Sequence, residues 1–311
     1  MKNIRFIPQD IILKDDAIHK KGSFGKIETW YYDAIFENNY SIVALINVIH
    51  LGLFTKILVG LYFYKDNKLI YQFRKNYSKR LFFSSEDTPI ISINNKQVLN
   101  EFIQNNSLDW ITKLSLGEDD WSVELNFKKI TKPWKGKTFL GYWLAIPRFI
   151  VDGFIICNNK RIQASGEGYH DHNLYPIYSP LTTKGYHFGK ISFDSLSITW
   201  ANVIKNRKKH QPIIVVNYGD KYFSVNPENI NFEIVNEKIE NKKEIPLTWK
   251  IIINDDKIKT NLLLDSIQNH YVSIPSVNYW RYHVGVKGKI FFNKIKEDID
   301  KIEIAEYLKF F

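Results

Sequence analysis

The feature that most constrains the fold of this chain is an almost unbroken succession of short strand-like runs, each ended by a turn signal. Tyr, Phe, Ile and Val are concentrated in these runs, and such residues favour extended backbone. Turn signals such as Glu37-Asn38-Asn39, Lys65-Asp66-Asn67 and Asn158-Asn159-Lys160 separate neighbouring runs. Repeated short strands with hairpin signals are typical of antiparallel sandwiches or barrels, not of βαβ units. The sequence therefore predicts an all-β protein.

The strand-like runs fall into two series. The first extends from 27–36 to 161–166 and the second from 186–191 to 301–307, while the stretch 175–185 between them is rich in Pro, Ser, Thr and Gly. Such a composition marks a connecting segment. In the first series, the looser stretch 76–116 predicts a short helix near 98–104. A chain of 311 residues is long enough for two moderate domains, and we expect them at 1–180 and 181–311.

The composition fits a folded protein in a reducing compartment. A hydrophobic content of 44% and an aromatic content of 15% are sufficient for a sizeable core. The single cysteine, Cys157, excludes an intramolecular disulfide, and residues 1–10 lack the apolar run of a signal peptide. The apolar segment Tyr40–Tyr64 is interrupted by polar residues and glycines, Lys56 among them, so we expect two buried strands there instead of a membrane helix. These features predict a cytoplasmic protein.

The formal net charge is +10, from 43 basic and 33 acidic residues. An excess of this kind can serve nucleic acid, an anionic membrane surface or simple solubility. The densest basic run, 205–210, lies between two strand-like stretches, and this position predicts a solvated hairpin tip. Because no RNA-recognition or helix-turn-helix pattern accompanies it, we expect no nucleic-acid partner. Weak peripheral attraction to anionic lipid headgroups is the more useful interpretation of the charge.

Polar chemistry is concentrated in one block, Gly166-Glu167-Gly168-Tyr169-His170-Asp171-His172-Asn173. Alternate residues of a strand share a face, so His170 and His172 point to one side and Asp171 to the other. Ile162 and Ala164 lie on the histidine parity, which predicts that the two histidines face the interior. The glycines could host a bulge that swaps these faces.

Two other interpretations of this block stay open at this point. Strand histidines are often structural and bonded to nearby backbone, and Asp-His-Asn can close a turn through its side chains. A metal site is the other option, because His-x-His supplies two ligands from one strand face. Neither Cys-x-x-Cys nor His-Glu-x-x-His accompanies it, so we assign no metal ligands from the sequence.

A second unusual stretch is 196–204. Its even positions are apolar except for Asn202, and they include Trp200. A buried amide needs hydrogen-bond partners, so Asn202 is either satisfied within the core or directed into a polar pocket. Nearby, His187 lies between Tyr186 and Phe188.

These pieces together resemble the AttH-like and carotenoid 1,2-hydratase (hydroxyneurosporene synthase) family of lipocalin-like proteins. The resemblance covers nearly the whole chain, and its most specific part is the block 166–173. The segments that carry it, in order, are Glu28–Asp33, Gly141–Trp143, Ile146–Arg148, Gly153, Gly166–Asn173, Tyr186–Lys190, Phe193–Val203, Tyr279–His283 and Ala305–Leu308. The resemblance implies two lipocalin-like (calycin-type) antiparallel β-barrel domains packed together, with an apolar cavity between or within them.

The resemblance also implies chemistry, namely the acid-catalysed addition of water to an isoprenoid double bond. Such a reaction needs a proton donor, surroundings that tolerate a tertiary carbocation, and a water molecule held nearby. The acid–base candidates are Asp171, His172, His170 and Tyr169. The candidate substrate-binding residues are Asn173, Trp30, Tyr32, Trp143, Tyr186, His187, Phe188, Trp200 and Asn202. Hydration is redox-neutral, so no cofactor is expected.

The chain departs from the hydratase pattern at two places. Leu174-Tyr175 follows Asn173 where the carotenoid enzymes have Trp-Gly. The nearest counterpart of their aromatic-x-Asp motif is 200–202, which ends in Asn202, and an amide cannot protonate an alkene. Asp171 or a histidine then takes the role of the acid, with Asp194 as a fallback, or the substrate differs, or the chemistry is absent.

Three functions therefore remain open. The first is a hydratase acting on a carotenoid or a polyprenyl lipid, the second a non-catalytic carrier of a long apolar isoprenoid or lipid ligand, and the third a cofactor-free cyclase of a polyene. Trp30 also has a structural interpretation, because lipocalin-like barrels often close one end with a Trp covered by an Arg. For that role we expect Arg281 to stack on Trp30.

Overall fold

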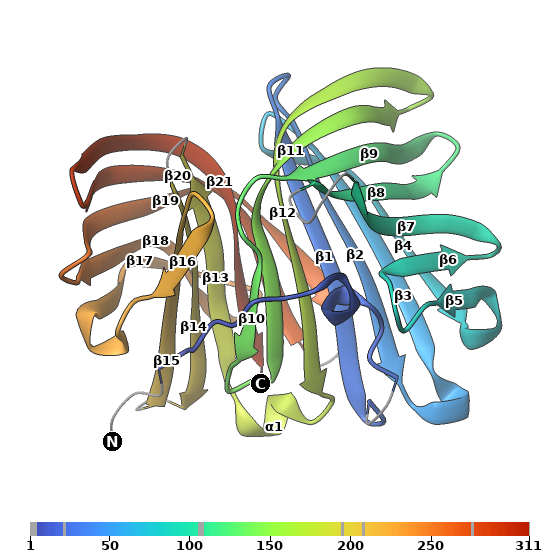
Figure 1. Ribbon diagram of the computed structural model, residues 1–311, viewed down its shortest axis with the longest axis horizontal. Helices are drawn as coiled ribbons and strands as arrows, with labels where there is room; N and C mark the ends of the chain where they lie inside the picture. Colours follow the sequence, from blue (N-terminus) through green and yellow to red (C-terminus); the bar gives the residue numbers. More distant parts are fainter. Residues whose placement is uncertain are drawn as a thin grey trace. The chain divides into compact units, whose positions relative to one another are not determined.

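A computed structural model describes residues 5–20, 23–104, 109–193, 196–206, 209–274 and 277–310 (Figure 1). About three quarters of these residues lie in the strands of two antiparallel sheets, which confirms the predicted all-β class of two lipocalin-like domains. The helical elements are short. They are the helix α1 (Ser179–Thr182) and the 3-10 turns Leu13–Asp16, Gly52–Phe54, Lys79–Leu81 and Pro227–Asn229.

The first unit comprises Gln9–Lys137 and Gly141–Tyr178. Its sheet has the strand order β4-β3-β2-β1-β12-β11-β9-β8-β7-β6-β5, with β10 paired to β11, and it curves into a nearly closed barrel. The strands are β1 (Lys26–Phe36), β2 (Tyr40–His50), β3 (Lys56–Lys65), β4 (Lys68–Ser78), β5 (Phe82–Ser84), β6 (Ile90–Ile93), β7 (Lys96–Gln104), β8 (Asp109–Glu118), β9 (Trp121–Lys129), β10 (Trp134–Lys137), β11 (Tyr142–Cys157) and β12 (Lys160–Pro176).

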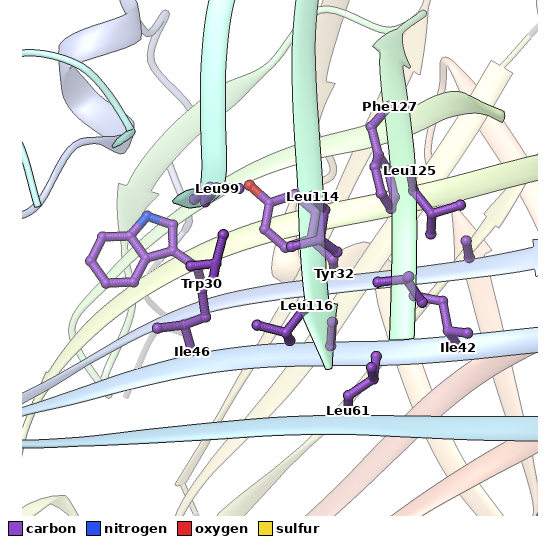
Figure 2. Close-up of a cluster of buried hydrophobic side chains, with 14 of the residues drawn as sticks. Trp30, Tyr32, Ile42, Ile46, Leu61, Leu99, Leu114, Leu116, Leu125 and Phe127 are labelled. Atoms are coloured by element: carbon purple, nitrogen blue, oxygen red, sulfur yellow. The ribbon is translucent and has the colours of Figure 1, made fainter. Parts of the chain in front are cut away.

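The interior of this barrel is filled by side chains from alternating positions of its strands. Figure 2 shows part of this core, in which Trp30 and Tyr32 of β1 lie among aliphatic and aromatic side chains of β2, β3 and β7 to β9. The other labelled residues are Ile42, Ile46, Leu61, Leu99, Leu114, Leu116, Leu125 and Phe127. Burial of this apolar surface is the main stabilising contribution to the barrel.

The second unit comprises Ser179–Phe311 together with Met1–Pro8 and Thr138–Leu140. Its sheet forms a half-barrel with the order β16-β15-β14-β13-β21-β20-β19-β18-β17, around a core that includes Trp200, Trp249 and Trp280. The strands are β13 (Gly185–Ser192), β14 (Leu196–Asn206), β15 (Lys209–Tyr218), β16 (Lys221–Ser224), β17 (Ile230–Glu240), β18 (Lys243–Asn254), β19 (Ile258–Ile274), β20 (Val277–Phe292) and β21 (Ile295–Phe310).

The two units differ from the domains expected at 1–180 and 181–311 in the exact boundary and in two short pieces, Met1–Pro8 and Thr138–Leu140, which belong to the second unit. The main division falls between Tyr178 and Ser179, but Thr138–Leu140 belongs to the second unit. The Gln211 side chain explains this, because its Oε1 accepts a hydrogen bond from the Phe139 backbone N–H at 2.8 Å. Single-sequence composition carries no signal for such a distant backbone contact.

The predicted helix near 98–104 is wrong. This segment is the strand β7, which pairs with β6 on one side and with β8 on the other. The ladder bonds on both sides override the local sequence signal. By contrast, Tyr40–Tyr64 forms β2 and β3, so the prediction of two buried strands is confirmed. Within the described residues, no helix is long and apolar enough to cross a membrane.

Candidate functional site

The two most specific sequence blocks of the chain lie side by side in the first sheet. β1 and β12 pair in antiparallel register, with Trp30 opposite His172 and Tyr32 opposite His170. The glycines of β12 do not form a bulge, and the register shift nearby lies in β11 instead. The strand therefore alternates as predicted, and both histidines point into the barrel.

Each histidine stacks on the aromatic ring that faces it across the strand pair. The centroids of Trp30 and His172 are 4.3 Å apart with planes at 24°, and those of Tyr32 and His170 are 4.1 Å apart with planes at 14°. Both histidines are fully buried. The two stacked pairs hold the imidazole rings in fixed orientations inside the barrel.

Hydrogen bonds fix His170 from both sides of its ring. Its Nδ1 lies 2.9 Å from the carbonyl oxygen of Tyr31, and its Nε2 lies 2.8 Å from Oδ2 of Asp16. Burial would raise the pKa of the Asp16 carboxyl, but His170 and His172 outweigh this and hold that pKa well below its usual range. Both ring nitrogens of His170 therefore have an oxygen partner inside the barrel.

His172 bridges two carboxylates. Its Nε2 lies 2.9 Å from Oε1 of Glu28, and its Nδ1 forms an ion pair of 2.9 Å with Oδ1 of Asp16. Burial lowers the pKa of the imidazole, but hydrogen bonds and charge from Asp16 and Glu28 prevail and raise it to about 9. His172 is thus a buried cation at neutral pH.

Glu28 is a fully buried carboxylate that contacts three imidazoles. His19 Nδ1 and His172 Nε2 lie 2.7 and 2.9 Å from its Oε1, and His50 Nε2 lies 2.7 Å from its Oε2. Burial would raise the pKa of Glu28, but the bonds from His172, His19 and His50 hold it well below the usual value. His19 connects this cluster to solvent, because 31% of its side chain is exposed.

Glu101 is the third buried carboxyl group of the interior network. Burial is the main reason that its pKa lies well above the usual range, and the charge of Asp16 adds to this. Its oxygens accept hydrogen bonds from the Tyr32 hydroxyl at 2.7 Å, the Thr112 hydroxyl at 2.8 Å and the Trp110 indole at 3.0 Å. The Asp16 and Glu28 carboxylates, the His170 and His172 imidazoles and the Glu101 carboxyl thus form one polar network inside the barrel.

Asp171 lies on the opposite face of β12, away from both histidines. The Tyr169 hydroxyl donates to its Oδ2 at 3.1 Å, and the Asn173 amide donates to its Oδ1 at 2.7 Å. The Trp143 indole also hydrogen-bonds the Tyr169 hydroxyl, and the ring of Tyr31 meets that of Tyr169 edge to face. Burial, assisted by the charge of Asp171, raises the pKa of the Tyr169 phenol well above its usual range.

The remaining expected site residues lie in the second unit, on β13 and β14. His187 stacks on Tyr307 with centroids 4.5 Å apart, and burial lowers its pKa to about 4 with help from His210. Asn202 lies opposite His187, and its buried Oδ1 has no hydrogen-bond partner among the described residues. Tyr186, Phe188 and Trp200 belong to the same two strands. Asp194 lies outside the described residues.

The expected stacking of Arg281 on Trp30 is wrong. The ring face of Trp30 is covered by His172, and its indole N–H donates to the backbone oxygen of Asp16 at 2.9 Å. Arg281 lies in the second unit, where its guanidinium contacts the ring of Tyr279 and pairs with Glu306 at 3.6 Å. A general pattern of lipocalin-like barrels suggested the pair, whereas in this chain the ring of His172 on the neighbouring strand stacks on Trp30.

Sequence reasoning missed the acidic half of the interior network, namely Asp16, Glu28 and Glu101, together with His19 and His50. A signal existed for Glu28, because it shares the strand parity of Trp30 and Tyr32 and so faces the interior. Asp16 belongs to a 3-10 turn that follows no periodic pattern. Two sets of these side chains bring three possible metal-ligand atoms within 4.8 Å of one another: His19, Glu28 and His172, and Asp16, Glu101 and His170.

Comparison with known proteins agrees with this architecture. No family model and no curated protein matches the chain. A candidate AttH protein from Nitrosomonas europaea superposes with a TM-score of 0.71 at 10% identity, over 98% of this chain and 99% of that one. The chain has the AttH-like fold. The fold predicted from the sequence resemblance is thereby confirmed.

Two further solved structures share this AttH-like fold. Kievitone hydratase from Nectria haematococca has a TM-score of 0.59 at 10% identity, covering 99% of this chain and 97% of that one. The protein CghA has a TM-score of 0.51 at 10% identity, covering 98% and 94%. At this identity the similarity concerns the fold, and residue roles must be argued from this chain alone.

Proposed function

We propose that this protein is a hydratase that adds water to a double bond of a long apolar isoprenoid, either a carotenoid or a polyprenyl lipid. The observation that carries the proposal is the Asp171 carboxyl, which Tyr169 and Asn173 hold from either side on a face with the aromatic rings of Tyr31 and Trp143. The fold shared with kievitone hydratase supports the reaction class.

In the proposed reaction, Asp171 in its acid form gives its proton to one alkene carbon. The C–H bond forms with the electrons of the double bond, and a tertiary carbocation remains on the other carbon. The faces of Tyr31 and Trp143 stabilise that cation. A water oxygen then bonds to the cationic carbon, and its proton returns to Asp171, which regenerates the acid and leaves a tertiary alcohol.

His170 and His172 act in this proposal as positioning residues. Both are fully buried and both of their ring nitrogens are occupied, so a substrate on the Asp171 face does not touch them. His170 bonds the backbone oxygen of Tyr31, and Tyr31 is the residue directly opposite Asp171. The interior network would therefore hold the two strands that carry the acid.

Apolar substrates reside in membranes, and one end of the first unit suits contact with an anionic bilayer. Phe24, Leu53 and Phe54 are 77%, 89% and 79% exposed. These three residues form what we term the apolar tip, because Gly52 brings the turn between β2 and β3 close to the Phe24 ring. Lys79 bonds the Gly52 carbonyl oxygen at 3.3 Å, and Lys56 is exposed beside the tip. We propose that the tip docks on anionic lipid.

The decisive experiment is mass spectrometry of lipids from a host that makes unsaturated isoprenoids, with and without this protein. Growth in heavy-oxygen water should yield a polyprenyl or carotenoid species heavier by one labelled water. Asp171→Asn should abolish this product, whereas Asp152→Asn, a matched change of an exposed carboxylate on β11, should retain it. An isomer of unchanged mass would instead indicate the cyclase, and an unmodified bound lipid would indicate the carrier.

A further inference from the structure

The side chains around Glu28 bring together three atoms that can each bind a metal ion. Two imidazole nitrogens, Nδ1 of His19 and Nε2 of His172, meet at the same carboxylate oxygen, Oε1 of Glu28, at 2.7 and 2.9 Å. The ligand atoms of these three residues lie within 4.8 Å of one another. The residues come from the segment before β1, from β1 and from β12, so the barrel itself brings them together.

We propose that His19, Glu28 and His172 form a binding site for a divalent transition-metal ion such as Zn²⁺. Two histidines and one glutamate are a ligand set that zinc uses when a coordination position is left open for water or substrate. Binding through Nε2 of His172 would release the proton that this nitrogen shares with Glu28 in the metal-free protein, because histidine binds a metal ion in its neutral form. Ligands at normal zinc distances in a tetrahedral site lie about 3.4 Å apart. The two nitrogens lie closer than this to Oε1 of Glu28, at 2.7 and 2.9 Å, so the side chains must move apart to admit the ion.

The atoms of His172 and Glu28 that would not bind the ion support the proposal independently, through their own partners. Metal-binding histidines usually give their other ring nitrogen to a carboxylate, and ligating carboxylates are themselves hydrogen-bonded. Here Nδ1 of His172 pairs with Asp16 at 2.9 Å, and the second oxygen of Glu28 contacts Nε2 of His50 at 2.7 Å. The atoms that would not bind the ion thus already have the partners that such a site requires.

Of the two possible metal-ligand sets, His19, Glu28 and His172 can be reached more easily by an ion from solvent than Asp16, Glu101 and His170. His19 is 31% exposed on its side chain, so an ion can enter from solvent. In the set Asp16, Glu101 and His170 all three side chains are buried, and Tyr32, Thr112 and Trp110 already occupy the Glu101 oxygens. The inference goes beyond the hydratase proposal, because hydration by Asp171 requires no metal.

The test uses the full-length protein without a histidine tag, stripped with a chelator and then titrated with Zn²⁺ in a calorimeter. We expect saturable binding of one ion per chain, with a Kd in the micromolar range or tighter. His19→Ala should weaken binding at least tenfold. The matched control His210→Ala changes a partly exposed histidine of the second unit and should leave the affinity unchanged.

His19 is the diagnostic position because it precedes the first strand and is partly exposed, so its replacement should leave the barrel folded. Co²⁺ provides a second readout, since tetrahedral coordination gives a strong visible absorption that His19→Ala should abolish. The proposal is overturned if the stripped protein binds no Zn²⁺ saturably, or if His19→Ala and wild type bind it with equal affinity. Both outcomes are separate from the lipid experiment, which tests Asp171 alone.

Discussion

His170 and Tyr32 lie opposite each other on β12 and β1, and their rings stack with centroids 4.1 Å apart. The same imidazole contacts Asp16, whose turn precedes β1 by about ten residues. One side chain thus joins two strands and a turn. The polar interior network is part of the core packing, and its charges should contribute to stability together with the apolar residues around them.

Replacement of His170 should destabilise the protein strongly. His170→Ala leaves the buried Asp16 carboxylate without one of its two imidazole partners, which costs about 3–5 kcal/mol of unfolding free energy. Urea denaturation followed by tryptophan fluorescence measures this difference. His210→Ala, a partly exposed histidine, should change the free energy by less than about 0.5 kcal/mol. A small effect of His170→Ala would show that the network contributes little.

Stability should depend on pH in two directions. Asp16 and Glu28 have pKa values lowered from 3.8 and 4.5, so their contribution is present above this range and is lost as the pH falls through the lowered values. His172 has a pKa raised from 6.5 to about 9, so its contribution is complete below pH 6.5 and is lost as the pH rises through 9. Glu101 has a pKa raised well above 4.5, so the stability that it contributes also decreases as the pH rises above 4.5.

Burial also lowers the pKa of His187 from 6.5 to about 4 and that of His283 from 6.5 to about 3, so the stability that these two imidazoles contribute is lost as the pH falls below 6.5. The melting temperature should therefore be highest near pH 6.5 and should fall on both sides. Differential scanning calorimetry from pH 3 to pH 10 measures this profile. If the melting temperature is constant from pH 6.5 to 10, His172 is not a buried cation in the folded protein.

A methyl group at Gly168 should destabilise the first barrel. A Cβ there would lie 2.7 Å from Val151 and 2.8 Å from the Phe127 ring and from the Asp33 carbonyl oxygen. Overpacking of this kind costs about 1–3 kcal/mol. Gly285→Ala is the matched control in a strand of the second unit, where the nearest atoms would be at an ordinary 3.8 Å. Equal denaturation midpoints for the two variants would contradict this assignment.

If Asp171 is the acid, loss of the Tyr169 hydroxyl should reduce turnover without unfolding the protein. Tyr169→Phe removes the hydrogen bond to Asp171 Oδ2 and keeps the ring that meets Tyr31. We expect kcat to fall about 10-fold to 100-fold, with a larger effect on kcat than on KM. Steady-state kinetics on the substrate identified by mass spectrometry give both values. An unchanged kcat would remove Tyr169 from the proposed site.

Polar substitutions in the apolar tip should weaken membrane contact. Leu53→Ser combined with Phe54→Ser should reduce co-sedimentation with phosphatidylserine-containing vesicles severalfold and leave the melting temperature unchanged, because both side chains are exposed. Exposed Leu181, which belongs to the second unit, is the control as Leu181→Ser. Wild-type protein should bind pure phosphatidylcholine vesicles more weakly. Equal binding to both lipids would contradict the role of the basic residues.

Local sequence pattern was sufficient for some features and insufficient for others. The alternation of the block 166–173 predicted that His170 and His172 face inward and Asp171 outward, because side-chain direction in a strand depends only on parity. The contact between His170 and Asp16 joins residues 154 positions apart, and no local pattern encodes it. The segment 98–104 was predicted as a helix because its pairing with β6 and β8 cannot be read from its own residues.

The pairing of β1 with β12 also determines when the first barrel can assemble during synthesis. Lys26 of β1 pairs with Pro176 of β12, so the full β1–β12 ladder cannot form until about 150 residues beyond Lys26 have been synthesised. Long loops of this kind close slowly, and the exposed edge of β1 is open to wrong pairing in the interval. The ion pairs of Asp16 and Glu28 with His170 and His172 cannot form before β12 has been made. These ion pairs therefore form late in the folding of the first unit.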